Sequence, residues 1–529
     1  MRPSALFPAP RPAAPDLLGI GRGLTENPDF NGRIRTSMAA RTLIIGLDGA
    51  DRRFIDRLIA EGELPHFKAL KERSATFEFE NDPGQGNVQF WTSAAIGENP
   101  AHHGHYFYMQ FDPDSYAIIS EPHFPLPPVT PFWKQLDGEG YRGAVVDWYE
   151  MPVTPLTHGE VIHRWFAEEP LTKTVFHPEA LGELAARYAE SDPIAEGYAS
   201  RPRRSAAERQ EFLDRVFSRI DIKGSFFTDH LRDKDYDFYI ACLSEAHNVG
   251  HYYMDVEDDR HGLHDATLAA EIGKPLRECY RRIDKVLGAV ISAAGDEANV
   301  FLLGGPGMEE FISANGAIDE MIRRVDVGYE APLTTADAAK ETYHSLIPAS
   351  LRGHLRPFAQ WGRRLLARNA YRDRRFFAVP HNDNAGAVRI NLKGREKFGT
   401  VAPGNEYQSV IEEIREGVSS FINPATGRSI VKRVIDTSKE FDGPYRDMLP
   451  DVFIEWDRTD TRGDFRTLVS ELFGEVTVAR HARTGDHSPF GFLWAPPAFS
   501  ETAISRPRDV AAPMLAAIRT AAPRNRQNR

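Results

Sequence analysis

The chain has 529 residues, of which 41% are apolar, and it carries a formal net charge of −12 at pH 7. No stretch approaches the ~18 uninterrupted apolar residues of a membrane-spanning helix, so we expect a soluble globular protein without a membrane partner. The negative charge argues against a nucleic-acid partner, because contacts to phosphates need a basic surface. The only cysteines, Cys242 and Cys279, exclude a disulfide framework and a cysteine-rich zinc module, and they favour a cytoplasmic location.

Residues 1–38 are rich in Pro and Arg. They lack the continuous apolar core of a secretory signal, so we predict a disordered N-terminal arm, with Met38 as an alternative start. Order is predicted to begin at residues 41–51, where the apolar run TLIIGL ends at Asp48 and an amphipathic helical pattern follows. This pattern is typical of a strand that leads into a helix.

Three later segments repeat the pattern of a short apolar run that stops abruptly. They are residues 141–150, 236–245 and 298–307. Short apolar strands that alternate with helical stretches predict an α/β fold in which a mainly parallel sheet is sandwiched by helices. Ligands in such sheets bind at the carboxyl ends of the strands.

Two regions, residues 155–235 and 325–380, interrupt the alternation. Neither contains a convincing buried strand, so we predict that both are helical cap insertions. They would belong to one catalytic domain at residues 39–500. Residues 501–529 are predicted to form a C-terminal helix and a tail.

Six segments occur in the order that is found in the alkaline phosphatase superfamily. They are LIIGLDGADRRFIDRLIAEGELPHFKALKE, FWTSAAIGENPAHHGHYFY, DFYIACLSEAHNVGHYYMD, GAVRINLKGREKFGTVAPG, MLPDVFIEW and RTGDHSPFGFLWA. More narrowly, the chain resembles the type I phosphodiesterase/nucleotide pyrophosphatase family over roughly residues 41–500. The resemblance implies an alkaline-phosphatase-like sheet and an enzyme with two metal ions, commonly zinc, one of which binds a Ser or Thr nucleophile.

The resemblance implies that the first of these metal sites survives in altered form. His251 and His487 match the family's ligands directly, whereas His247 stands where the family has an Asp. Three neutral imidazoles suit Zn²⁺, with Fe or Cu as alternatives, better than Mg²⁺ or Ca²⁺. Against this stands the fact that two histidines four residues apart are common on helices that bind no metal. Asp48 is a candidate fourth ligand or base, and the alternative role for it is a helix N-cap.

The second metal site of the family is lost. The position of the nucleophile is occupied by Asn87, and the family's Asp-His pair becomes Gly305 and Pro306. An amide has no hydroxyl to deprotonate, so no covalent phosphoenzyme can form there. We interpret the nearby Thr92 and Ser93 as the start of a helix and not as a displaced nucleophile. Random decay should remove ligands from both metal sites about equally. Because the ligands are lost from one site only, we favour a centre that was rebuilt around one ion.

Two further groups of histidines are candidates for metal or substrate binding. The cluster of His102, His103 and His105 matches a family segment that supplies no ligand, so we predict a structural role for it. His261 and His264 lie close enough in sequence to the first pair for a role in substrate binding, which stays an alternative.

The pattern predicts a metal-dependent hydrolase with one three-histidine site and no Ser/Thr nucleophile, acting on an anionic small molecule such as a phosphoester or a sulfate ester. An ion with three neutral ligands acidifies a bound water towards a pKa near ~7. Asp48 would orient or deprotonate that water, Asn87 would donate hydrogen bonds to a substrate oxygen, and Arg483 would contact the anion. The alternatives are a non-haem iron or copper enzyme with oxidative or lyase chemistry, and a binding pseudoenzyme without catalysis. The sequence gives no indication of the oligomeric state.

Overall fold

The structure is a computed structural model, and all of its described residues belong to the unit Ala39–Arg529. The described residues are 41–84, 86–120, 123–149, 151–166, 174–194, 205–232, 234–328, 371–459, 466–479 and 482–521. The predicted arm at residues 1–38, most of the predicted cap at residues 325–380 and the last eight residues of the predicted tail therefore lie outside them. Within the described part of the chain, no helix is both long and apolar enough to span a membrane.

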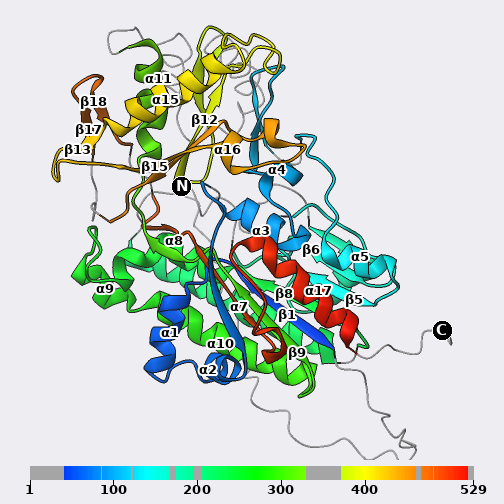
Figure 1. The fold of residues 1–529 in the computed structure, drawn as a ribbon. Coiled ribbons are helices and arrows are strands. Elements are labelled where there is room, and N and C mark those ends of the chain that lie inside the picture. The colour runs from blue at the N-terminus through cyan, green and yellow to red at the C-terminus, as the bar shows by residue number, and fades with distance from the viewer. Residues whose placement is uncertain are drawn as a thin grey trace, which may run out of the picture. The chain divides into compact units, whose positions relative to one another are not determined.

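An eight-stranded sheet forms the centre of the fold, in the order β2-β20-β9-β1-β8-β5-β6-β7 (Figure 1). Its strands are β1 (Thr42–Leu47), β2 (Ala75–Glu80), β5 (Gly143–Val146), β6 (Glu160–His163), β7 (Val175–His177), β8 (Phe238–Leu243), β9 (Asn299–Gly304) and β20 (Phe490–Ala495). The five strands from β9 to β6 run parallel, whereas β20 and β7 pair antiparallel with their neighbours. The four strands predicted from sequence are β1, β5, β8 and β9, so the predicted α/β class is confirmed.

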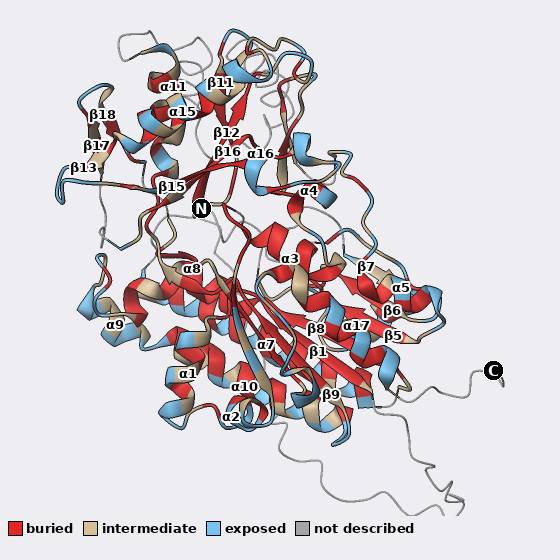
Figure 2. Cartoon of the chain, in the orientation of Figure 1, coloured by how far each residue is buried: buried red, intermediate tan, exposed pale blue. Residues whose placement is uncertain are grey.

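The central strands are buried on both faces, which Figure 2 shows as a largely buried sheet. Side chains alternate along β1, so that Leu43 and Ile45 join one apolar core and Ile44 joins another. The first core is lined by α1 (Arg52–Ala60), α2 (Pro65–Glu72), α7 (Ala206–Arg232), α8 (Glu245–Glu257) and α10 (Pro275–Ala294). The second core is lined by α3 (Asn87–Ile96), α5 (Phe132–Gly138) and α17 (Ala511–Thr520).

The expectation that residues 325–380 contain no buried strand is wrong, because β11 (Phe376–Val379) is buried at all four positions. The same expectation for residues 155–235 is also wrong. β6 lies in this segment, is buried at three of its four positions, and pairs in parallel with β5. The strand was missed because EVIH has only two apolar residues, between a Glu and a His, whereas the equally short β5 is wholly apolar. The long helix α7 of the same segment packs against α10 and closes one face of the main sheet.

A third core lies between α11 (Ile318–Val327), α15 (Asn405–Ser419) and an antiparallel sheet. That sheet has the order β11-β12-β16-β15 and consists of β11 (Phe376–Val379), β12 (Ala385–Ile390), β16 (Val452–Trp456) and β15 (Val431–Asp436). A smaller sheet joins β14 (Arg428–Ser429), β13 (Ile422–Asn423), β17 (Thr467–Ser470) and β18 (Gly474–Thr477). Two further pairs are β3 (Met109–Phe111) with β4 (Ile118–Ser120), and β10 (Met308–Glu310) with β19 (Gly485–His487).

The remaining helices of the described residues are short. They are α4 (Pro100–His103), α6 (Ala180–Ala186), α9 (Ala266–Ile272), α16 (Thr437–Glu440), and the 3-10 turns Asn315–Ala317, Arg446–Met448, Pro497–Phe499 and Pro507–Val510.

Candidate metal centre

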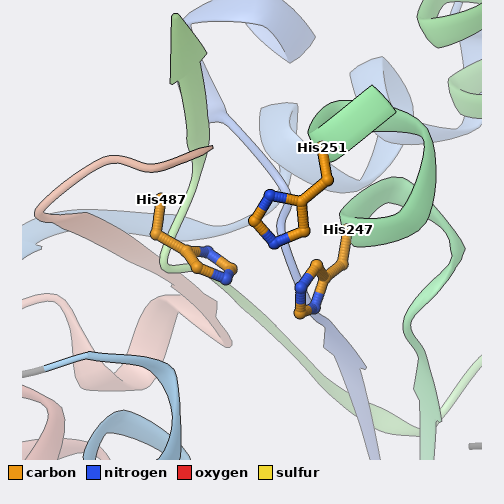
Figure 3. A group of neighbouring side chains, drawn as sticks. All are labelled: His247, His251 and His487. Atoms are coloured by element: carbon orange, nitrogen blue, oxygen red, sulfur yellow. The ribbon is translucent and has the colours of Figure 1, made fainter. Parts of the chain in front are cut away.

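The structure brings the three predicted ligands together. His247 and His251 lie one turn apart on α8, which follows β8 directly, and His487 is the last residue of β19. Each residue offers one ring nitrogen, and these nitrogens lie within 4.8 Å of one another. The ring centroids are 4.5 Å apart for His247 and His251, and 4.6 Å and 5.1 Å from each of these to His487. Figure 3 shows the ring of His487 extending towards the two rings from the helix.

Glycines allow the backbones around the centre to approach closely. Gly49 has a φ of +68°, and a Cβ there would lie 2.5 Å from the Cα of His247. A Cβ on Gly485 would lie 2.1 Å from the carbonyl oxygen of Gly250 on α8. Side chains at these positions would push α8 away from the end of β1 and from β19. The distance between the histidines therefore depends on residues that have no side chain.

Hydrogen bonds fix the tautomers of the three rings. The Nδ1 atom of His251 is 2.8 Å from the carbonyl oxygen of Gly485, and that of His487 is 3.4 Å from the carbonyl oxygen of Pro306. The Nδ1 atom of His247 contacts Oδ2 of Asp48. Because these oxygens only accept hydrogen bonds, each Nδ1 carries the proton and each Nε2 keeps its lone pair.

The Nε2 atom of His251 is the strongest sign that the residues suit a metal ion. It is buried and has no hydrogen-bond partner among the described residues. A buried polar atom without a partner costs free energy, and a metal ion at this nitrogen would remove that cost. The arrangement, with Nδ1 bonded to an oxygen and Nε2 left over, is also the one that metal-bound histidines adopt.

Burial keeps two of the three rings neutral. It lowers the pKa of His251 well below the ordinary value, and the charges of Arg483, His247 and His487 add to this effect. Burial likewise lowers the pKa of His487 well below its ordinary range, with His247 and Arg483 as further causes. Only a neutral imidazole can give its lone pair to a metal, so His251 and His487 are ready to bind at neutral pH.

Asp48 lies beside this group and is not a member of it. Its carboxylate is fully buried at the end of β1, where Oδ1 accepts a hydrogen bond of 2.9 Å from Nε1 of Trp91. Oδ2 accepts from Nδ2 of Asn87 at 3.3 Å and from the ring of His247. The alternative role as an N-cap is wrong, because Asp51 caps α1 through the N–H of Phe54.

Asn87 is the first residue of α3 and touches the centre through Asp48. Its Oδ1 atom is buried without a hydrogen-bond partner among the described residues. The interpretation of Thr92 and Ser93 as a helix start is wrong, since α3 begins at Asn87 and both residues lie inside it. Ser93 Oγ instead lies 3.1 Å from Nε2 of His103.

The sequence also singled out Arg483, as an anion contact, and Gly305 with Pro306, which stand where the family has metal ligands. Arg483 is close enough for its charge to lower the pKa of His251, and its Nη1 atom lies 3.5 Å from Oδ2 of Asp383. Gly305 and Pro306 follow β9 and contribute no side-chain ligand, although the carbonyl oxygen of Pro306 contacts His487.

The remaining predicted histidines bond to other parts of the chain. His102 is exposed, whereas the buried Nδ1 of His103 accepts from the backbone N–H of His105. Nε2 of His261 lies 2.8 Å from the carbonyl oxygen of Thr484, and Nδ1 of His264 lies 2.7 Å from that of Asp255. These contacts favour structural roles.

Two residues of the centre were missed from the sequence. Trp91 holds Asp48, and the hydroxyl of Tyr149 lies 3.3 Å from Nδ1 of His247. Tyr149 follows the end of β5, so the rule that ligands bind at carboxyl strand ends would have pointed to it.

No protein-family model matches the sequence, and no curated protein sequence matches it. Solved structures do match. Phosphonoacetate hydrolase from Sinorhizobium meliloti 1021, in complex with phosphonoacetate, is 15% identical with a TM-score of 0.51, and the match covers 92% of this chain and 96% of that one. Human ectonucleotide pyrophosphatase/phosphodiesterase 5 is 12% identical with a TM-score of 0.46, covering 92% and 96%. The similarity to phosphonoacetate hydrolase shows that this chain has the alkaline-phosphatase-like α/β fold that its sequence predicted.

Proposed function

We propose that the protein is a metal-dependent hydrolase that holds one divalent transition metal through His247, His251 and His487. The observation that carries the proposal is the buried Nε2 of His251, which has no hydrogen-bond partner among the described residues and lies in a group of three histidines. A donor set of three imidazoles favours zinc, with iron or copper as alternatives. A metal bound there would polarise a substrate oxygen and acidify a water.

The proposed substrate is an anionic small molecule, either a phosphoester or a sulfate ester. Two observations support this class. The centre lies at the carboxyl ends of parallel strands, where α/β sheets bind ligands. One solved structure with this fold is a phosphonoacetate hydrolase in complex with phosphonoacetate, a small anion.

We assign Asp48 the role of orienting His247. Its carboxylate holds the Nδ1 proton of the ring, so that Nε2 carries the lone pair that a metal would bind. This role replaces the fourth ligand that we expected from the sequence, because both oxygens of Asp48 already accept hydrogen bonds from Trp91, Asn87 or His247. To act as a base, Asp48 would have to use the second lone pair of Oδ1, beside the hydrogen bond from Trp91.

Asn87 is proposed to contact the substrate. Its Nδ2 atom uses one N–H for Asp48, which leaves the second N–H for a substrate oxygen and Oδ1 for a hydroxyl or a water. The N-terminus of α3, where Asn87 lies, also favours negative charge. Arg483 is the further candidate for an anion contact, in competition with Asp383.

Water would be the nucleophile in this proposal. Asn87 has no hydroxyl, and Ser93 and Thr92 are buried inside α3. No covalent enzyme intermediate is therefore expected, and the reaction should proceed by direct hydrolysis.

The test is hydrolysis of an aryl phosphodiester and of an aryl sulfate by the zinc-loaded protein. We expect turnover that stops after chelation, returns with zinc, and falls at least about 100-fold in His251→Ala, because one ligand is lost. His230→Gln is the matched control. His230 is also buried, but it bonds to Glu160 at the start of β6, whereas the metal centre lies where the parallel strands end.

Three outcomes would contradict the proposal. Turnover that survives chelation or His251→Ala would show that the three histidines do not carry the reaction. Iron or copper in the protein, with every ester inert, would favour oxidative or lyase chemistry. Tight binding of an ester analogue without turnover would favour the binding pseudoenzyme.

A further inference from the structure

A cluster of buried charges lies between α7, α8 and the end of β5. Lys223 on α7 is 1% exposed, and its Nζ atom lies 3.1 Å from Oδ2 of Asp147 and 3.5 Å from Oε1 of Glu245. Glu245, the first residue of α8, is fully buried, and the fully buried Arg219 lies 4.0 Å from the same oxygen. Arg219 in turn pairs with Asp192. Buried ions are costly, and apolar residues of similar size often stabilise a fold better.

The cluster is joined to the metal centre through α8. Glu245 and Asn248 are three residues apart, so they share one face of the helix, and Asn248 Oδ1 lies 3.5 Å from Nη1 of Arg219. His247 and His251 are four residues apart and face the third histidine. The first turn of α8 is therefore fixed by charges on one side and presents the metal ligands on the other.

A second connection runs through the segment after β5. Asp147 has a φ of +57°, and its Oδ1 atom accepts a hydrogen bond of 2.7 Å from the N–H of Trp165. Two residues further on, the hydroxyl of Tyr149 lies 3.3 Å from Nδ1 of His247. Lys223 pairs with Asp147 as well as with Glu245, so one ammonium group bridges the two segments that meet at His247.

We propose that Lys223 is a positioning residue of the metal centre. It sets the distance between the segment that carries Tyr149 and the first turn of α8, and thereby the orientation of the His247 ring. The inference rests on the proposed metal site. It explains why charged groups are kept in the core here. An ammonium group that must pair with two carboxylates fixes the positions of both, which an apolar contact does not do.

Chelator competition with zinc tests the proposal in Lys223→Met. We expect metal binding to weaken by about tenfold, the lower end of the range for residues that act on a metal through its ligands. With cobalt in place of zinc, the visible absorption spectrum should change, because the ligand geometry changes. A purely structural role would alter neither the affinity nor the spectrum of the folded protein.

Arg209→Met is the matched control. Arg209 also lies on α7 and is buried, and its guanidinium binds both oxygens of Asp255 near the other end of α8, at 2.7 Å and 2.9 Å. This variant breaks a buried pair between the same two helices, so it should lower the unfolding midpoint to a similar extent. Its zinc affinity and cobalt spectrum should stay as in the wild type.

Glu245→Gln covers the case in which Lys223→Met does not fold. It keeps the pair of Lys223 with Asp147 and removes the negative charge through which Lys223 and Arg219 hold the start of α8. It should therefore fold and still bind zinc more weakly than the wild type. Wild-type affinity in the folded variants of Lys223 and Glu245 would overturn the inference alone. A wild type that binds no metal would overturn the proposed function, and the inference with it.

Discussion

At the scale of single residues, Asp48 determines how the centre is organised. It joins Trp91, Asn87 and His247 in one buried set of hydrogen bonds. A carboxylate that bonds to a ligand ring fixes the tautomer and makes the ring a better donor to the metal. The family resemblance implies an Asp at position 247, where this chain has a His. With His at this position, Asp48 has a ring that it can orient through a hydrogen bond.

Asp48→Asn should weaken zinc binding by about 10-fold to 100-fold. An amide can offer only one accepting oxygen, so it cannot serve the N–H groups of Trp91, Asn87 and His247 together. Chelator competition measures the effect. Asp51→Asn is the control, because Asn caps a helix as well as Asp does, and it should leave the affinity unchanged. Equal affinities for the two variants would show that Asp48 does not act on the metal ligands.

At the scale of elements, the centre depends on how closely α8 approaches β19. The absence of a side chain at Gly485 permits that approach, and the carbonyl oxygen of Gly485 also holds His251. Gly250 on α8 instead makes room for Met308 of β10, the strand that pairs with β19. Two backbone segments therefore set the position of the ligands as directly as the side chains do.

Gly485→Ala should reduce both stability and metal binding. The new methyl group would lie 2.1 Å from the carbonyl oxygen of Gly250, so α8 and β19 must separate, at a cost of about 1–3 kcal/mol. Urea unfolding and zinc titration measure the two effects. Gly138→Ala in α5 is the control, because a Cβ there meets no atom within 4 Å. An unchanged zinc affinity in Gly485→Ala would contradict the role assigned to this contact.

The elements of the main sheet could be predicted where the sequence carries a long apolar run. β1, β8 and β9 have six residues each, and helices follow the first two in the chain. β6 has only two apolar residues, and its burial is a consequence of pairing with β5, which no local pattern encodes. The antiparallel sheet of β11, β12, β15 and β16 was not predicted for a similar reason, since its order departs from the order of the chain.

At the scale of the whole molecule, the site exists only in the folded chain. Asp48 and His247 are 199 positions apart, and His251 and Gly485 are 234 apart. Spacing alone predicts only the pair on α8. The end of the first predicted strand pointed to Asp48, and the family resemblance supplied His487. Trp91 and Lys223 became visible only when the fold placed them beside Asp48 and Glu245.

The metal content of the purified protein tests the central claim most directly. We predict about one transition metal ion per chain by elemental analysis, loss of most of it in His247→Ala, and retention in His230→Gln, whose ring lies at the other end of the parallel strands. A wild-type protein without metal after incubation with zinc, iron or copper would contradict the account, and so would a His247→Ala variant that keeps a full complement.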